Sequence, residues 1–245
     1  MDKQEKLFKN ICRLAGEAVV KYRMIAEGDR LLVGLSGGKD SFVLMHVLAH
    51  LQAVAPVRFS FSAATFDPGF SGFGIGDVSE YCQRFGWEHH TVSLNVPELL
   101  KEKNYTGTPC VLCSRLRRGK LYGLAGDLKC GKLALGQHLD DIIISFFMSS
   151  CRGQGLSTMA PRVKPENPEH PEIIRPLALV PEGLISEYAS SLNLPPSGKC
   201  EYYDLLQSGD RVYFKELLAK LEEQIPDVRT NLLNSLRNVK SEHLL

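Results

Sequence analysis

The chain has 245 residues and a mass of 27.2 kDa, which is enough to bury the core of one α/β domain with a small appended part. Apolar residues make up 44% and charged residues 23%, so disordered, collagen-like and coiled-coil classes are excluded. The net charge of +1 excludes a uniformly basic nucleic-acid coat but leaves room for a local basic patch. No stretch is apolar enough to span a membrane and the N-terminus lacks a signal-peptide pattern, so we expect no membrane partner and a cytoplasmic location.

The distribution of apolar residues predicts alternating strands and helices, which indicates an α/β fold. Helices are expected over residues 5–25, 42–51, 76–85, 114–128, 138–151 and 181–192, and over 211–238 with a break at Pro226. Strands are expected over residues 31–35, 57–63, 90–94 and 133–135, with a short one near 173–174 in a proline-rich loop. This order predicts a Rossmann-like parallel sheet with helices on both faces, plus a small helical C-terminal region. We place the domain boundary between residues 1–192 and 193–245.

The first loop with a chemical signature follows the strand over residues 31–35 and opens a helix. It reads Ser36, Gly37, Gly38, Lys39, Asp40 and Ser41. The glycines let the backbone approach an anion, and the helix N-terminus adds N–H donors that favour phosphate. Lys39 can offset phosphate charge, and Asp40 can hold Mg²⁺ or cap the helix. The spacing of the glycines excludes both a Walker P-loop and a dinucleotide fingerprint.

A second strand end also runs into a helix, with the string Gly136, Gln137, His138, Leu139, Asp140 and Asp141. Two adjacent carboxylates near phosphates can place Mg²⁺ or orient a nucleophile, and His138 can donate a hydrogen bond to a phosphate. Alternatively, the two carboxylates only stabilise the helix N-terminus. The sequence leaves open which of them is catalytic.

The string Ser-Gly-Gly-x-Asp-Ser resembles the PP-loop of the adenine-nucleotide α-hydrolase family. The resemblance implies ATP binding at Ser36–Ser41, cleavage between the α and β phosphates, and adenylation of a substrate oxygen before a nucleophile displaces AMP. The second string resembles the Gly-His-His-x-Asp-Asp motif of the tRNA-modifying members, with Gln137 in place of the first histidine. It implies nucleotide contacts at Gly136 and His138 and catalytic roles for Lys39, Asp40, Asp140 and Asp141.

Cysteines form a third candidate site. Cys110 and Cys113 have a spacing that suits a metal, a cluster iron or a redox pair, and Cys200 lies in a proline- and glycine-containing loop. The other four cysteines fall within periodic elements and are expected to be buried apolar residues: Cys12, Cys82, Cys130 and Cys151.

The run from Pro109 to Gly119 and the C-terminal tail resemble the TtcA family of tRNA 2-thiocytidine biosynthesis proteins. The resemblance covers nearly the whole chain and places Cys110, Cys113 and Cys200 on the ligands of a [4Fe-4S] cluster. It implies a tRNA sulfurtransferase that adenylates the C2 oxygen of an anticodon-loop cytidine and replaces it with sulfur bound to the open iron. We further expect a sulfur donor such as a cysteine desulfurase, and a homodimer.

A basic stretch over residues 99–132 accompanies the cysteine pair. It contains eight lysines or arginines against Glu102 and Asp127, so its net charge is +6 and the rest of the chain carries −5. Such a patch attracts phosphate backbones, and we expect tRNA to dock there. A lysidine-synthetase-like ligase is a second hypothesis, but it needs no cysteine cluster. A non-catalytic ATP-binding regulator is a third; the lysine and carboxylates of the two strings argue against it.

Overall fold

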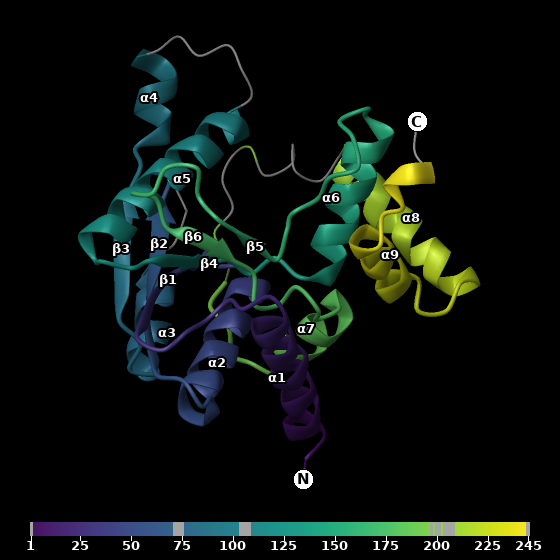
Figure 1. Cartoon of the computed structure of the whole chain (residues 1–245). Helices are drawn as coiled ribbons and strands as arrows, with labels where there is room; N and C mark the ends of the chain where they lie inside the picture. Colours follow the sequence, from purple (N-terminus) through teal and green to yellow (C-terminus); the bar gives the residue numbers. More distant parts are fainter. Residues whose placement is uncertain are drawn as a thin grey trace.

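The computed structural model describes residues 2–70, 76–102, 109–196, 198, 202 and 209–243. Within these ranges a six-stranded sheet carries helices on both faces (Figure 1). The strands are β1 (Asp29–Gly34), β2 (Phe59–Asp67), β3 (His89–Ser93), β4 (Lys132–Ala134), β5 (Arg162–Val163) and β6 (Glu172–Ile174). Their order in the sheet is β3-β2-β1-β4-β6-β5, and all neighbours are parallel except β5 and β6. The predicted parallel α/β sheet is confirmed, with an antiparallel edge added.

The helices include each one that the apolar periodicity predicts. They are α1 (Lys3–Lys21), α2 (Lys39–Val54), α3 (Gly76–Arg84), α4 (Val96–Glu102), α5 (Pro109–Asp127), α6 (Leu139–Cys151), α7 (Glu182–Ala189), α8 (Asp210–Gln224), α9 (Val228–Arg237) and a short 3₁₀ helix (Ser241–His243). The break between α8 and α9 falls at Pro226, as expected. No helix in the described ranges is long and apolar enough to cross a membrane.

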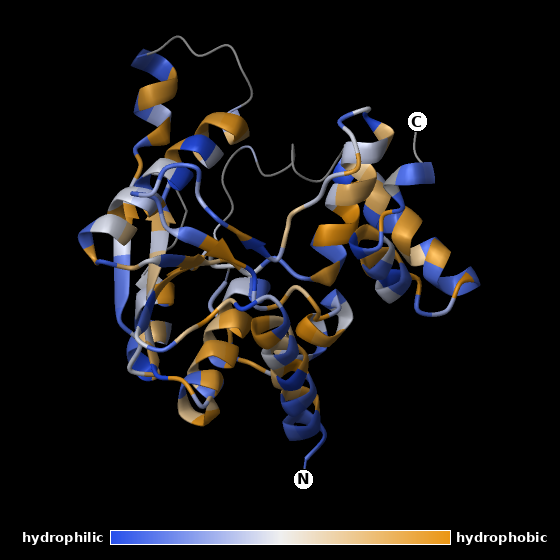
Figure 2. Ribbon diagram, in the orientation of Figure 1, coloured by the Kyte–Doolittle hydropathy of each residue, from blue (hydrophilic) through white to orange (hydrophobic). Residues whose placement is uncertain are grey.

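The central strand β1 buries both of its faces, which explains its continuous apolar run. Leu31 and Val33 join a large apolar cluster with α1 and α2, whereas Leu32 joins a smaller cluster with α5. Helix α2 is apolar over most of its length, while α1 is largely polar on its outer side (Figure 2). The side chains of β1 therefore alternate between two apolar layers, as a strand with helices on both faces requires.

The C-terminal helices pack on the sheet domain through α6 (Figure 1). Phe214 and Leu218 of α8 and Val228 and Leu233 of α9 are buried in the same large cluster as the sheet residues. Helices α8 and α9 thus share a core with the sheet. The division at residue 192 stays a prediction.

Three local predictions are corrected by the structure. Helix α5 begins at Pro109, five residues before the expected start, because proline suits the first turn of a helix, where its missing N–H costs nothing. Cys110 and Cys113 therefore lie in α5 and not in a loop. Cys151, expected to be buried, is exposed because it ends α6, whereas Cys12, Cys82 and Cys130 are buried as predicted. Helix α4 and strand β5 were not predicted, since elements of seven and two residues are too short for a periodic signal.

Candidate active site

The site lies at the point where the strand order reverses. Strand β1 has β2 on one side and β4 on the other, so the loops after β1 and β4 emerge side by side at the carboxyl edge of the sheet. Open α/β sheets bind ligands in the crevice that such a reversal creates. The two loops touch: a Cβ on Gly136 would lie 3.1 Å from the backbone of Asp40 and Ser41. A side chain there would force the neighbouring backbone to move, so glycine favours this approach and the two predicted motifs lie in contact.

The Ser36–Ser41 loop is held in a tight turn by its own hydroxyl groups. The Ser36 N–H donates to Ser41 Oγ at 3.2 Å, and Ser41 Oγ donates to the Gly38 carbonyl at 2.8 Å. Gly37 has a φ of +81°, a left-handed conformation that favours glycine, and a Cβ there would meet no atom within 4 Å. The turn leads into α2, whose N-cap is Gly38 and has no side-chain cap. The N–H groups in the first turn of a helix are suited to binding an anion.

Lys39 is fixed at the loop by two carboxylates. Its Nζ lies 2.7 Å from Asp40 Oδ1 and 3.1 Å from Glu182 Oε1, the latter at the start of α7. Burial by itself lowers the pKa of Lys39, but these carboxylates outweigh it and raise the pKa above its usual value. Lys39 is therefore a permanent positive charge beside the loop.

Glu182 also accepts a 2.8 Å hydrogen bond from Lys215 of α8, so it links the loop to the C-terminal helices. Burial by itself raises the pKa of Glu182, but Lys215 and Lys39 lower it to about 2. A lowered carboxyl pKa contributes stability that is fully present above the unfolded value of about 4.3 and is lost as the pH falls towards 2.

We expect Glu182→Gln to lower the free energy of unfolding at pH 7, by on the order of 3 kcal/mol for a pKa that far below its usual value. The difference from wild type should shrink as the pH falls from about 4.3 towards 2, because the wild-type carboxyl then becomes protonated. Urea unfolding of both proteins at a series of pH values measures this. A difference that is the same at pH 3 and pH 7 would contradict the linkage.

His138 lies among three carboxylates. It is 3% exposed, and its Nε2 lies 3.5 Å from Asp141 Oδ2 and 3.9 Å from Asp40 Oδ1. Its Nδ1 is buried, has no hydrogen-bond partner among the residues that the structure describes, and lies 3.9 Å from Asp140 Oδ2. His138 therefore lies in the second loop and faces Asp40 of the first loop. Its nucleotide-binding role stays a prediction.

The adjacent residues Asp140 and Asp141 have different surroundings. Asp140 is 4% exposed; its Oδ1 accepts from Arg229 Nε of α9 at 2.6 Å and its Oδ2 accepts from the Glu182 N–H at 2.8 Å. Asp141 lines the cavity, accepts from the His138 N–H at 3.1 Å and pairs with Arg211 of α8. Asp140 thus joins α6 to α7 and α9, whereas Asp141 faces the space where a ligand would bind.

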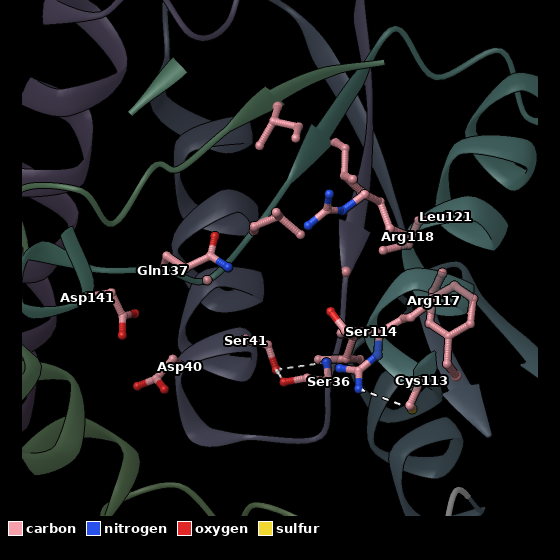
Figure 3. A pocket seen from close by; sticks show the side chains of 18 of the residues that line it. Ser36, Asp40, Ser41, Cys113, Ser114, Arg117, Arg118, Leu121, Gln137 and Asp141 are labelled. Carbon is pink, nitrogen blue, oxygen red and sulfur yellow. Dashed lines mark hydrogen bonds between the residues drawn. The ribbon is translucent and has the colours of Figure 1, made fainter. Parts of the chain in front are cut away.

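Cys110 and Cys113 lie on the cavity-facing side of α5, opposite the carboxylates. Figure 3 shows Asp40, Gln137 and Asp141 on one side of the pocket and Cys113 on the other, with Ser36 and Ser41 between them. Both cysteines line the cavity, and Arg117 Nη2 donates to Cys113 Sγ at 3.8 Å. Cys200 lies outside the described residues. Within the described ranges no three histidine, cysteine or carboxylate residues form a complete metal site.

One cavity of about 1070 Å³ joins these parts. Its charged lining combines two carboxylates with a larger number of arginines: Asp40, Asp141, Arg117, Arg118, Arg175 and Arg211. An excess of positive charge in a concave site favours a polyanionic ligand. The volume is slightly above the roughly 300–1,000 Å³ that is typical of small-molecule sites, which leaves room for a nucleotide and a substrate base.

Sequence reasoning missed the residues that reach the site from the second half of the chain: Arg175, Glu182, Arg211, Lys215 and Arg229. They occur singly in ordinary-looking segments, and no motif marks them. Only Arg175 could have been found from the sequence, because it directly follows a predicted strand, and open α/β sheets bind ligands at the carboxyl ends of their strands.

Comparison with known proteins agrees with this geometry. The sequence profile of the PP-loop domain matches residues 5–195. A tRNA-cytidine(32) 2-sulfurtransferase of Syntrophotalea carbinolica is 36% identical over 99% of this chain and 93% of its own. The enzyme of the same name from Idiomarina loihiensis is 40% identical over 98% of this chain and 79% of its own.

Among solved structures, the fold is similar to the U34-tRNA thiolase NcsA from Methanococcus maripaludis, determined with its [4Fe-4S] cluster. The TM-score is 0.75 at 24% identity, covering 98% of this chain and 82% of NcsA. The chain therefore belongs to the PP-loop family and, within it, to the family of the tRNA-cytidine(32) 2-sulfurtransferases.

Proposed function

We propose that the protein is an ATP-dependent tRNA sulfurtransferase that converts an anticodon-loop cytidine, position 32 in the names of its relatives, to 2-thiocytidine. The observation that carries this proposal is that the Ser36–Ser41 loop and the Cys110/Cys113 pair line one cavity. ATP must activate the oxygen on C2 of the cytidine, and sulfur must then attack C2. The nucleotide site and the sulfur site therefore have to lie beside the same base.

The first half-reaction is adenylation. The C2 oxygen of the cytidine attacks the α-phosphorus of ATP, the bond to the β-phosphate oxygen breaks, and pyrophosphate leaves. The N–H groups at the start of α2 and the charge of Lys39 are suited to stabilise the phosphates. Asp40 and Asp141 both line the cavity and can hold Mg²⁺ together with phosphate oxygens.

The second half-reaction replaces the activated oxygen. Sulfur at the hydrosulfide level attacks C2, the bond from C2 to the original oxygen breaks, AMP leaves with that oxygen, and the sulfur loses its proton to give the thiocarbonyl. Cys110 and Cys113 are one helical turn apart on α5 and both line the cavity, so their thiolates fit two positions of a cluster. Three cysteine ligands would leave one iron of a bound [4Fe-4S] cluster free to supply the sulfur. We propose Cys200 as the third ligand; Tyr202, two residues later in the chain, lines the same cavity.

The tRNA would bind along α5. Arg115, Arg117, Arg118 and Lys120 are all exposed, and two of them, Arg117 and Arg118, line the cavity. Phosphates bound along this helix would place an unpaired loop nucleotide at the cavity mouth. A cysteine desulfurase as sulfur donor, a homodimer and a cytoplasmic location complete the proposal.

Replacing Arg115 and Lys120 with alanine should weaken tRNA binding and lower the salt slope of log K by up to about two, since each lost phosphate contact removes roughly one unit. Neither side chain lines the cavity, so ATP affinity should not change. Replacing Lys6 and Lys9 removes the same charge and is the control, because both belong to α1, which lies below α5 and apart from it in Figure 1. Equal slopes for the two double variants would place the docking surface elsewhere.

The experiment that tests the function is complementation of a strain that lacks 2-thiocytidine. Mass spectrometry of its tRNA nucleosides should show 2-thiocytidine restored by the wild-type gene. Appearance of lysidine, or of no modified nucleoside from a folded, ATP-binding protein, would favour the ligase or the regulator instead.

A further inference from the structure

Arg175 is a buried arginine beside the proposed nucleotide site. It directly follows β6, so it lies at the carboxyl edge of the sheet next to the loop after β4. The residue is 8% exposed, and the part that remains accessible lines the cavity.

The hydrogen-bond partners of Arg175 are neutral. Its Nε donates to Gln137 Oε1 at 3.0 Å, and its Nη1 donates to the Ala160 carbonyl. Among the residues that the structure describes, no carboxylate forms an ion pair with it. Burial lowers its pKa, and the charge of Asp141 opposes that effect only in part.

Other buried or half-buried arginines of the chain differ in this respect. Arg229 is paired with Asp140 and Glu222, and Arg162 is paired with Glu172 at 2.7 Å. A buried charge without a partner is costly, whereas a paired one is compensated. Arg175 therefore has a positive charge that no ion pair compensates in the described part of the protein. This charge lies at the wall of the cavity.

We propose that Arg175 binds a phosphate group of the nucleotide and that Gln137 positions its guanidinium for this contact. The inference deepens the proposed function and rests on it. An entering phosphate would supply the missing negative charge at the remaining N–H groups of the guanidinium, which is suited to bidentate contact with phosphate oxygens.

Two sources of phosphate are chemically possible, ATP and the RNA backbone, and the position of Gln137 favours ATP. Gln137 directly follows Gly136, whose Cα packs on the backbone of Asp40 and Ser41 in the phosphate loop. The same contact explains the glutamine at this position. A carboxamide oxygen accepts the Arg175 hydrogen bond at any pH, whereas a protonated imidazole has no acceptor and would repel the guanidinium.

Equilibrium binding of a non-hydrolysable ATP analogue, of adenosine and of tRNA tests the assignment. Arg175→Met should weaken binding of the analogue about 10- to 100-fold, which is the usual range for losing a charge-assisted hydrogen bond. It should weaken binding of adenosine less than about twofold. Gln137→Glu keeps the arginine but compensates its charge with a carboxylate, so it should also weaken binding of the analogue at least about 10-fold. The control is Arg162→Met, which removes a paired arginine from β5; its melting temperature should fall while its affinity for the analogue stays within about twofold.

Three results would overturn the inference. Wild-type affinity of Arg175→Met for the analogue would show that no phosphate binds there. An equal loss for adenosine would indicate a distorted pocket, and a loss confined to tRNA would assign the arginine to the RNA backbone. A wild-type protein that does not bind the analogue at all would overturn the proposed function itself, which distinguishes the two failures.

Discussion

Replacing Cys113 with alanine is expected to abolish 2-thiocytidine formation while leaving ATP binding intact. The thiol lies on the cavity wall opposite Gln137 and Asp141, and Arg117 donates to its sulfur (Figure 3). Loss of a direct cluster ligand should cost more than the roughly 10- to 100-fold that is typical of losing an outer partner of a metal site. The measurements are 2-thiocytidine in tRNA, iron per chain of anaerobically purified protein, and affinity for an ATP analogue.

A matched control is available in α6. Cys151 is an exposed cysteine at the end of that helix, so Cys151→Ala should retain iron, thiolation and nucleotide binding. Thiolation by Cys113→Ala at the wild-type level would contradict the assignment of the cysteine pair. A protein that holds one zinc and no iron would contradict the cluster.

Replacing each of the two adjacent carboxylates with asparagine should separate stability from catalysis. Asp140→Asn removes the buried partner of Arg229 and leaves it only the half-exposed carboxylate of Glu222, a change that costs about 3 kcal/mol. For a chain of this size that corresponds to a fall of roughly 6–12 °C in melting temperature. At temperatures well below its melting temperature, this variant should retain most of the wild-type rate of ATP turnover.

Asp141→Asn should have the opposite profile. Its partner Arg211 is half exposed, so losing the ion pair should cost less than about 1 kcal/mol. Loss of a carboxylate that lines the proposed phosphate site should slow adenylation, on the order of the 100- to 1000-fold that removal of one electrostatic group of an active site costs. Pyrophosphate release and thermal unfolding of both variants provide the comparison. A melting temperature that falls more for Asp141→Asn than for Asp140→Asn would contradict the separation.

Local sequence was sufficient for the central strands and for the two loops of the site. The apolar run before Ser36 and the glycines after it are determined within about ten residues, because a buried parallel strand and a tight anion-binding turn each depend on neighbouring side chains. The same holds for the loop at Gly136. The resemblance carried by these loops and by the cysteine pair indicated the family, which the comparisons confirm.

Tertiary structure alone decided which side chains complete the site. Asp140 and Asp141 are equivalent in the sequence, but neighbours in a helix point about 100° apart, and the packing of α8 and α9 on α6 determines which of them faces the cavity. Glu182 and Arg175 reach the loops from positions more than 130 residues after Ser36–Ser41, because parallel strands bring distant segments to one edge of the sheet. Such contacts depend on the strand order, which no local pattern of residues contains.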